Sequence, residues 1–215
     1  MCLKPRPPLS RRVGSARGVT IIEATIVLAV AAILVAFAVP AASRSLDSVR
    51  LTRAMTDEDA IVTAIGNFID ENSFRPFTAS GLSGGTIVQM LVSDGDTATT
   101  SGAGSASWTT AVNGSTVDFL ERHLVTNNPG GSGAYATGAT GWRGAYINAP
   151  LDPDPWGNRY AVNVLYLKSL TLNDVFVYSA GPNELIQTEF TKDGVVPRDD
   201  DLTSVVSRDD GDTVP

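Results

Sequence analysis

Residues 17–40 read RGVTIIEATIVLAVAAILVAFAVP, and this stretch decides the fold of the N-terminal part of the chain. From residue 19 to residue 39 the run has no proline, and Glu23 is its single charged side chain. A helix of this length, at about 1.5 Å per residue, spans about 30 Å, which matches the hydrocarbon core of a bilayer. An acid buried there costs roughly 2.5–3.5 kcal/mol, so we expect Glu23 to lie near the membrane edge or to pair with a partner.

A basic segment precedes the apolar run. It contains no acidic residue, and its basic residues are Lys4, Arg6, Arg11, Arg12 and Arg17. The positive-inside tendency therefore places this end in the cytoplasm and directs the apolar helix outward. Residues 41–43 imitate the end of a secretory signal peptide, but the apolar core of such a peptide has only about 7 to 15 residues. The longer run favours an anchor.

Gly18, Glu23 and Pro40, spaced along this apolar run, resemble the class III signal of type IV pilins and of the pseudopilins of type II secretion. The resemblance implies that a membrane aspartic peptidase, the prepilin peptidase, cuts between Gly18 and Val19 on the cytoplasmic side. It also implies N-methylation of Val19, at a position where the family usually has Phe. Residues 1–18 are then a basic leader peptide that is removed.

The resemblance gives Glu23 a physical role. A cut at Gly18 frees an amine at Val19, and the Glu23 carboxylate can pair with the amine of its own or of a neighbouring subunit, which costs less than a lone charge. The alternative is that Glu23 sits in the headgroup region of a simple signal anchor. Under the first interpretation Glu23 and Pro40 set assembly and register.

The helix continues beyond the membrane segment. Residues 19–39 are predicted to form the transmembrane or fibre-core helix, and Pro40 is expected to kink the helix without ending it. From Leu46 to Ile69, through Val49 and Met55, apolar residues recur every three or four positions with charged residues between them. This pattern predicts that residues 40–71 form an amphipathic continuation that packs on a sheet.

Residues 72–141 are rich in Gly, Ser and Thr, and we expect a variable, loop-rich region. Within it, residues 86–92 suit a strand or a short helix, and residues 117–125 a helix. His123, the only histidine in the sequence, is expected at the surface or half-buried. It lacks the second histidine or cysteine that zinc binding or nucleophilic catalysis requires.

Residues 142–206 are predicted to form a C-terminal β-sheet, with short antiparallel strands near 144–147, 161–167 and 175–178. The segment from Asp154 to Tyr160 reads DPWGNRY and resembles a segment of the major pseudopilin of type II secretion. The fold class implied is α+β: the type IV pilin fold, in which a long N-terminal helix packs against a small antiparallel sheet. Residues 207–215 are an acidic tail.

The same resemblance implies a calcium ion. In major pseudopilins the last loop binds calcium, which takes six to eight oxygen ligands. The matching residues are Ser179, Asn183, Asp199 and Asp200. The alternative interpretation of these acids is a solvated, exposed tail.

Composition narrows the functional classes. Removing residues 1–18 takes five of the 16 basic residues and none of the 23 acidic ones, which changes the net charge from -7 to -12. Such a charge disfavours nucleic-acid binding. The single cysteine, Cys2, lies in the leader, so the mature chain has no disulfide. Asp152 and Asp154 precede prolines, which indicates a rigid turn and not an acid–base pair, and we expect no enzyme.

The sequence therefore predicts a structural subunit of a type IV pilus-like fibre, most like the pseudopilus of a type II secretion system. It would be a single-pass inner-membrane protein with its C-terminal domain in the periplasm. The expected partners are further copies in a helical filament, the prepilin peptidase, an inner-membrane assembly platform and minor pseudopilins. Two alternatives remain: a membrane-anchored periplasmic binding module, and a minor pilin in adhesion or DNA uptake.

Overall fold

The computed structural model describes residues 19–72, 77–82, 84–100, 116–138, 141–148, 151–168, 174–188 and 201–207. The chain has two compact units, Met1–Leu46 and Asp47–Pro215. Helix α1, Ile21–Asn72, includes residues of both. Pro40 lies inside α1, so the proline does not end the helix, as the sequence predicts.

The first unit exposes its apolar side chains. Every described residue from Val19 to Leu46 is exposed, and α1 is long and apolar enough in this part to cross a membrane. By length and composition this segment suits a membrane anchor or a signal sequence.

The second unit begins with the half of α1 that buries a stripe of side chains. The stripe recurs every three or four residues and consists of Ala54, Glu58, Ile61, Ala64, Ile65, Phe68, Ile69 and Asn72. The sequence pattern extended this stripe to Leu46, Val49 and Met55, and that extension is wrong, because all three side chains are exposed. The packed face therefore starts at Ala54.

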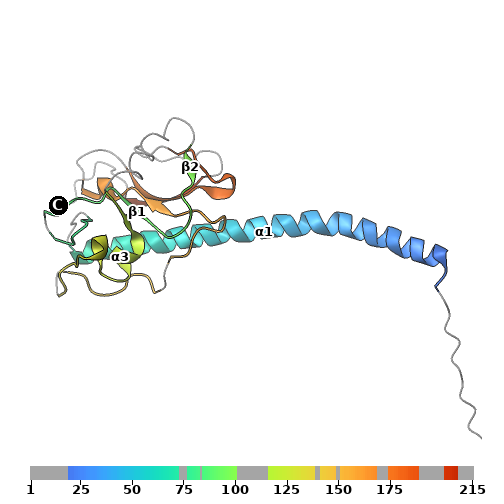
Figure 1. Cartoon of the computed structure of the whole chain (residues 1–215), viewed down its shortest axis with the longest axis horizontal. Coiled ribbons are helices and arrows are strands. Elements are labelled where there is room, and N and C mark those ends of the chain that lie inside the picture. The colour runs from blue at the N-terminus through green and yellow to red at the C-terminus, as the bar shows by residue number, and fades with distance from the viewer. Residues whose placement is uncertain are drawn as a thin grey trace, which may run out of the picture. The chain divides into compact units, whose positions relative to one another are not determined.

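A five-stranded sheet lies along this half of α1 (Figure 1). Its order is β3-β1-β4-β5-β7, and the strands are β1 Met90–Val92, β3 Val117–Phe119, β4 Ala161–Val162, β5 Val175–Ser179 and β7 Leu202–Ser207. The pairs β1–β4, β4–β5 and β5–β7 are antiparallel, but β1 and β3 are parallel. The α+β class is confirmed, whereas the sheet is mixed and not antiparallel throughout.

Short elements connect and flank the sheet. They are β2 Thr99–Thr100 and β6 Leu185–Ile186, which pair in parallel, the helix α3 Leu120–Leu124, and the 3-10 turns η1 Pro129–Gly131, η2 Val164–Lys168 and η3 Gly181–Asn183. The helix expected over 117–125 is thus a strand followed by a shorter helix. The strand expected over 161–167 ends at Val162 and continues as η2, and residues 144–147 form no strand. The strand expected near 175–178 is confirmed as β5.

Strand β5 is buried on both faces of the sheet. Val175 and Val177 of β5 belong to the cluster that includes the α1 stripe, whereas Phe176 and Tyr178 belong to a second cluster with Ile186. Successive residues of a strand point to opposite faces, so β5 contributes to both clusters. Ser179 ends β5, and η3 begins two residues later at Gly181, which places the end of β5 at the predicted ligand loop.

Candidate functional site

The start of α1 combines an exposed apolar surface with one carboxylate. Glu23 is exposed, and its backbone N–H donates to Thr20 Oγ1 at 3.3 Å, while Ala24 N–H donates to the carbonyl of Thr20 at 3.1 Å. Thr20 thus caps the helix, and Thr-x-x-Glu is the capping-box pattern. The sequence analysis missed this local role, although the four-residue pattern contains the signal. Gly18 lies outside the described residues, and Val19 is exposed.

A buried carboxylate organises the Asp-Pro-Trp-Gly turn. Asp154 Oδ1 accepts hydrogen bonds from the N–H groups of Trp156 at 3.0 Å and of Asn158 at 2.8 Å. Asp154 Oδ2 accepts from the Ser179 hydroxyl at 2.8 Å. This carboxylate therefore holds the turn and ties it to the end of β5.

The predicted calcium ligands are only partly described. Ser179 is fully buried and donates its hydroxyl to Asp154. Asn183 is exposed, donates its amide to Gln187 Oε1 at 2.7 Å and accepts from Leu185 N–H at 2.8 Å. Asp199 and Asp200 lie outside the described residues. Within the described part no three metal-binding side chains gather, so these residues alone do not form a calcium site, and calcium stays a prediction.

Asp201, the next acid, has a structural role that the sequence analysis missed. Its Oδ2 accepts from Gln187 N–H at 3.0 Å and from both the N–H and the hydroxyl of Thr188, each at 2.6 Å. Its Oδ1 accepts from the Tyr178 hydroxyl at 3.1 Å. Asp201 therefore fastens the segment after β6 to β5, and its oxygens are already engaged by protein donors.

Glu58 is the acid that the fold places deepest on α1. Its side chain is 1% exposed, Oε2 accepts from the Ser204 hydroxyl of β7 at 3.0 Å, and Oε1 has no hydrogen-bond partner within the described residues. Burial raises the pKa of Glu58 to about 8, although the hydrogen bond from Ser204 opposes the shift. Glu58 is therefore mostly protonated at neutral pH.

A buried polar network surrounds His123, so the expectation of a surface or half-buried histidine is wrong. Asp118 Oδ2 lies 2.8 Å from His123 Nε2, and the Tyr135 hydroxyl lies 2.5 Å from Nδ1. The neutral ring that donates from Nε2 and accepts at Nδ1 satisfies both partners. Burial lowers the pKa of His123, although the hydrogen bond that its ring donates to Asp118 opposes the shift. With no exposed surface, the histidine is structural.

Asp118 accepts three further hydrogen bonds. They come from Arg122 Nη1 at 2.8 Å and from the N–H groups of Phe119 at 2.8 Å and Gly130 at 2.5 Å. Burial alone would raise the pKa of Asp118, but the hydrogen bonds from His123, Gly130 and Phe119 hold it well below its usual range. Asp118 is therefore ionised, and it anchors both α3 and η1.

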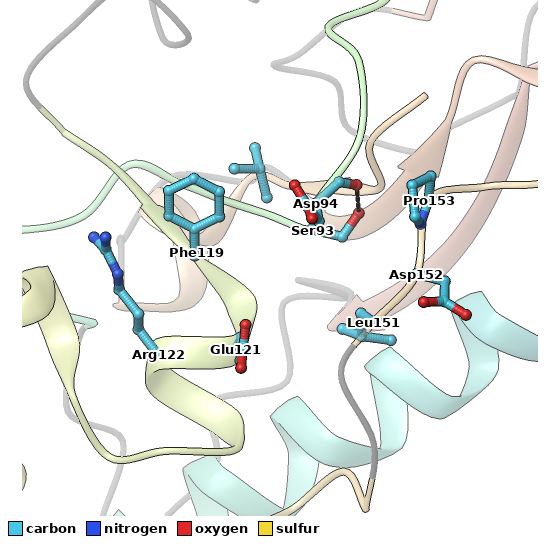
Figure 2. Close-up of a pocket in the computed structure, with 9 residues that line it drawn as sticks. Ser93, Asp94, Phe119, Glu121, Arg122, Leu151, Asp152 and Pro153 are labelled. Carbon is cyan, nitrogen blue, oxygen red and sulfur yellow. Dashed lines mark hydrogen bonds between the residues drawn. The ribbon is translucent and has the colours of Figure 1, made fainter. Parts of the chain in front are cut away.

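Beside this network lies an open groove of about 310 Å³. It is lined by Val92, Ser93, Asp94, Phe119, Glu121, Arg122, Leu151, Asp152 and Pro153 (Figure 2). Arg122 and Asp152 lie at opposite ends in this view, with Asp94 and Glu121 between them. The groove combines apolar walls with three exposed carboxylates, an arrangement that suits a cationic group carried on an apolar stem.

Comparison of the chain with protein-family models, with curated proteins and with solved structures finds no match. The resemblance to type IV pilins and pseudopilins therefore rests on the residues quoted from the sequence.

Proposed function

We propose that the chain is a structural subunit of a type IV pilus-like fibre, most like the pseudopilus of a type II protein secretion system. The observation that carries the proposal is the first half of α1, which exposes an apolar surface with Glu23 as its single charge between residues 19 and 39. Exposing such an apolar surface to water is unfavourable, so we expect lipid or other helices to cover it. Before assembly a membrane surrounds this surface with lipid, and after assembly a fibre core covers it with other helices.

In this proposal the prepilin peptidase removes residues 1–18 and the amine of Val19 becomes the N-terminus. The chain stays in the inner membrane, with the domain in the periplasm, until an assembly platform and minor pseudopilins extract it into the fibre. Copies related by a rotation and a rise make contacts that do not close, which produces a filament. Glu23 pairs with the Val19 amine of its own or of an adjacent copy and fixes the register.

The processing step is tested by intact-mass spectrometry of the chain extracted from membranes. We expect a chain that begins at Val19, unmodified or heavier by one methyl group. A full-length chain, or one cut after Ala42, would contradict the proposal.

The role of Glu23 is tested by the replacement Glu23→Ala. The variant should remain in the membrane but assemble at least about tenfold fewer fibres, because each growing contact loses an ion pair in an apolar setting. Thr25→Ala is the matched control, since Thr25 is exposed in the same turn and bonds only the Ile22 carbonyl at 2.8 Å. Equal fibre yields from Glu23→Ala and the wild type would refute the role.

The groove beside α3 favours a second candidate, a membrane-anchored periplasmic binding module. That function needs the anchor but no cut at Gly18 and no assembly. Electron microscopy of membranes that overproduce the chain separates the two candidates: fibres support the subunit, and their absence together with an uncut N-terminus supports the binding module.

A further inference from the structure

The groove beside α3 has an apolar wall and an acidic rim. Phe119, Leu151 and Pro153 line it and are partly exposed, while Asp94 and Glu121 on its rim are exposed. Arg122 and Arg159 of the same chain already lie over the Phe119 ring, so the stem of an incoming cation packs on Leu151 and Pro153 while its charge faces the carboxylates. The groove therefore suits the side chain of arginine or lysine.

Arg122 does not neutralise the rim, because its charge is already matched. Its guanidinium donates to Asp118 at 2.8 Å and stacks 4.9 Å from the centre of the Phe119 ring. Asp118 is buried, ionised and outside the groove lining. The carboxylates of Asp94 and Glu121 thus remain available to a second cation.

The second half of α1 carries the complementary surface. Arg50 is exposed and forms no ion pair with any described residue. Val49, beside it, is 64% exposed, and Leu46, one turn earlier, is 62% exposed. An apolar ridge with a cation at its end matches an apolar groove with acids on its rim.

We propose that in the fibre the groove receives Arg50, with Val49 beside it, from α1 of a second copy of this chain; this inference rests on the proposed function. Two other arginines on α1 are exposed. Arg53 already pairs with Asp57 at 3.5 Å and with Asp152 at 3.8 Å in its own chain, and Arg44 lies only five residues, about 8 Å, beyond Val39, at headgroup depth. Arg50 lies about 16 Å beyond Val39, clear of the headgroups.

This contact offsets repulsion that arises from the net charge of the mature chain. At -12 per copy, adjacent domains repel one another. An arginine between Asp94 and Glu121 of the next copy places positive charge beside two of its carboxylates, and it fixes which face of one copy meets which face of the other. The contact is heterologous, so it propagates along a filament.

Cysteine cross-linking tests the contact, because the mature sequence contains no cysteine. Val49→Cys combined with Glu121→Cys should give, on oxidation of purified fibres, a ladder of dimers, trimers and longer multimers. A disulfide requires Cβ atoms about 3.5–4.5 Å apart, so the ladder reports direct contact. Val49→Cys combined with Ala136→Cys is the matched control, since Ala136 is exposed and does not line the groove.

Charge reversal provides the second test. Asp94→Lys with Glu121→Lys should reduce fibre yield at least about tenfold, because like charges then meet at a desolvated contact. Adding Arg50→Glu to that variant should restore much of the yield, whereas adding Arg44→Glu should not. The melting temperature of the detergent-extracted chain identifies a variant that fails to fold.

Two failures are distinguishable. If wild-type fibres form but the Val49–Glu121 pair gives no ladder and charge reversal leaves the yield unchanged, this inference is overturned and the proposed function stands. If the wild type forms no fibres, the proposed function fails and this contact fails with it. Cross-linking of Glu121→Cys to a different protein, in place of a second copy, would also overturn the inference.

Discussion

The start of α1 and the domain that follows it distribute side chains in opposite ways. Residues 19–46 expose valine, isoleucine, leucine and phenylalanine to their surroundings, whereas the domain buries Glu58, Asp118, Asp154 and Asp201. Both arrangements invert the usual pattern of apolar residues inside and charged residues outside. The two regions differ in whether these side chains find partners within the described part of the chain.

Three of the four buried acids accept hydrogen bonds at both carboxylate oxygens, whereas Glu58 Oε1 has no partner among the described residues. Asp118, Asp154 and Asp201 each accept three or more hydrogen bonds from described residues. The exposed apolar residues of α1 have no such partners within the described chain. The domain therefore satisfies most of its buried carboxylates internally, whereas the start of α1 leaves its apolar side chains exposed.

The largest expected difference is in the free energy of unfolding when one phenylalanine from each region is replaced by alanine. Phe68 stacks on Phe77 with ring centres 4.5 Å apart, and Phe68→Ala should lower the free energy of unfolding by about 3–5 kcal/mol. Phe37, 76% exposed, should change that free energy by less than about 0.5 kcal/mol when replaced by alanine, but should reduce fibre yield. Chemical denaturation of the detergent-extracted chain measures both. Equal destabilisation by the two replacements would contradict the proposed difference between the start of α1 and the domain.

The second prediction concerns the stability that a buried acid gives to the domain. Asp118→Asn removes the charge that faces Arg122 and His123, and it should cost about 3 kcal/mol because the guanidinium then has no anionic partner. Asp70→Asn, at an exposed position on α1, is the control and should stay within about 0.5 kcal/mol of the wild type. Thermal unfolding distinguishes them, and an unaffected melting temperature for Asp118→Asn would contradict the account.

A smaller effect concerns pH. The pKa of Glu58 rises from 4.5 to about 8 on folding, so the folded state binds this proton more tightly than the unfolded state does. The contribution of Glu58 to stability is therefore fully present below about pH 4.5 and is lost as the pH rises through 8. Glu58→Gln should remove this decline and gain about 2 kcal/mol over the wild type at about pH 9 relative to about pH 6.5.

Two comparisons isolate the Glu58 effect. The lowered pKa of His123 acts in the opposite direction, since its contribution grows as the pH rises toward 6.5, but it is the same in the wild type and in Glu58→Gln. Asp70→Asn, which removes an exposed acid farther along α1, should keep the wild-type profile. Parallel pH profiles for the wild type and Glu58→Gln would show that the carboxyl of Glu58 does not titrate as described.

The smallest effect lies at the helix start. Thr20→Ala removes the acceptor for the Glu23 N–H and should cost about 1 kcal/mol of local helix stability. Amide hydrogen exchange at Glu23 should accelerate about fivefold, while exchange in β5 stays unchanged. Unchanged exchange at Glu23 would mean that the cap contributes nothing there.

The sequence is sufficient to predict features that depend on local pattern. The continuity of α1 through Pro40, the turn at Asp154 and the strand β5 follow from hydrophobic periodicity and from proline and glycine positions. The packed stripe was extended too far, to Leu46, because periodicity shows that one face is apolar but not where the covering sheet ends.

The sequence analysis did not predict features that depend on contacts between residues far apart in the sequence. Glu58 stands between Asp57 and Asp59 and resembles a solvated charge, and only Ser204, 146 positions away, reveals its burial. His123 lies in a segment with helical periodicity, but Tyr135 reaches it from a loop twelve residues later. The groove is formed by residues from β1, β3, α3 and the segment around Asp152, and no local pattern brings these together.

The most direct test of the central claim is electron cryo-microscopy of fibres purified from cells that produce the chain. The account predicts a filament in which residues 19–39 of successive copies pack along the axis and the domains face outward. Fibres with the domains at the axis and the start of α1 at the surface would contradict it, as would a purified, processed chain that forms no fibre at all.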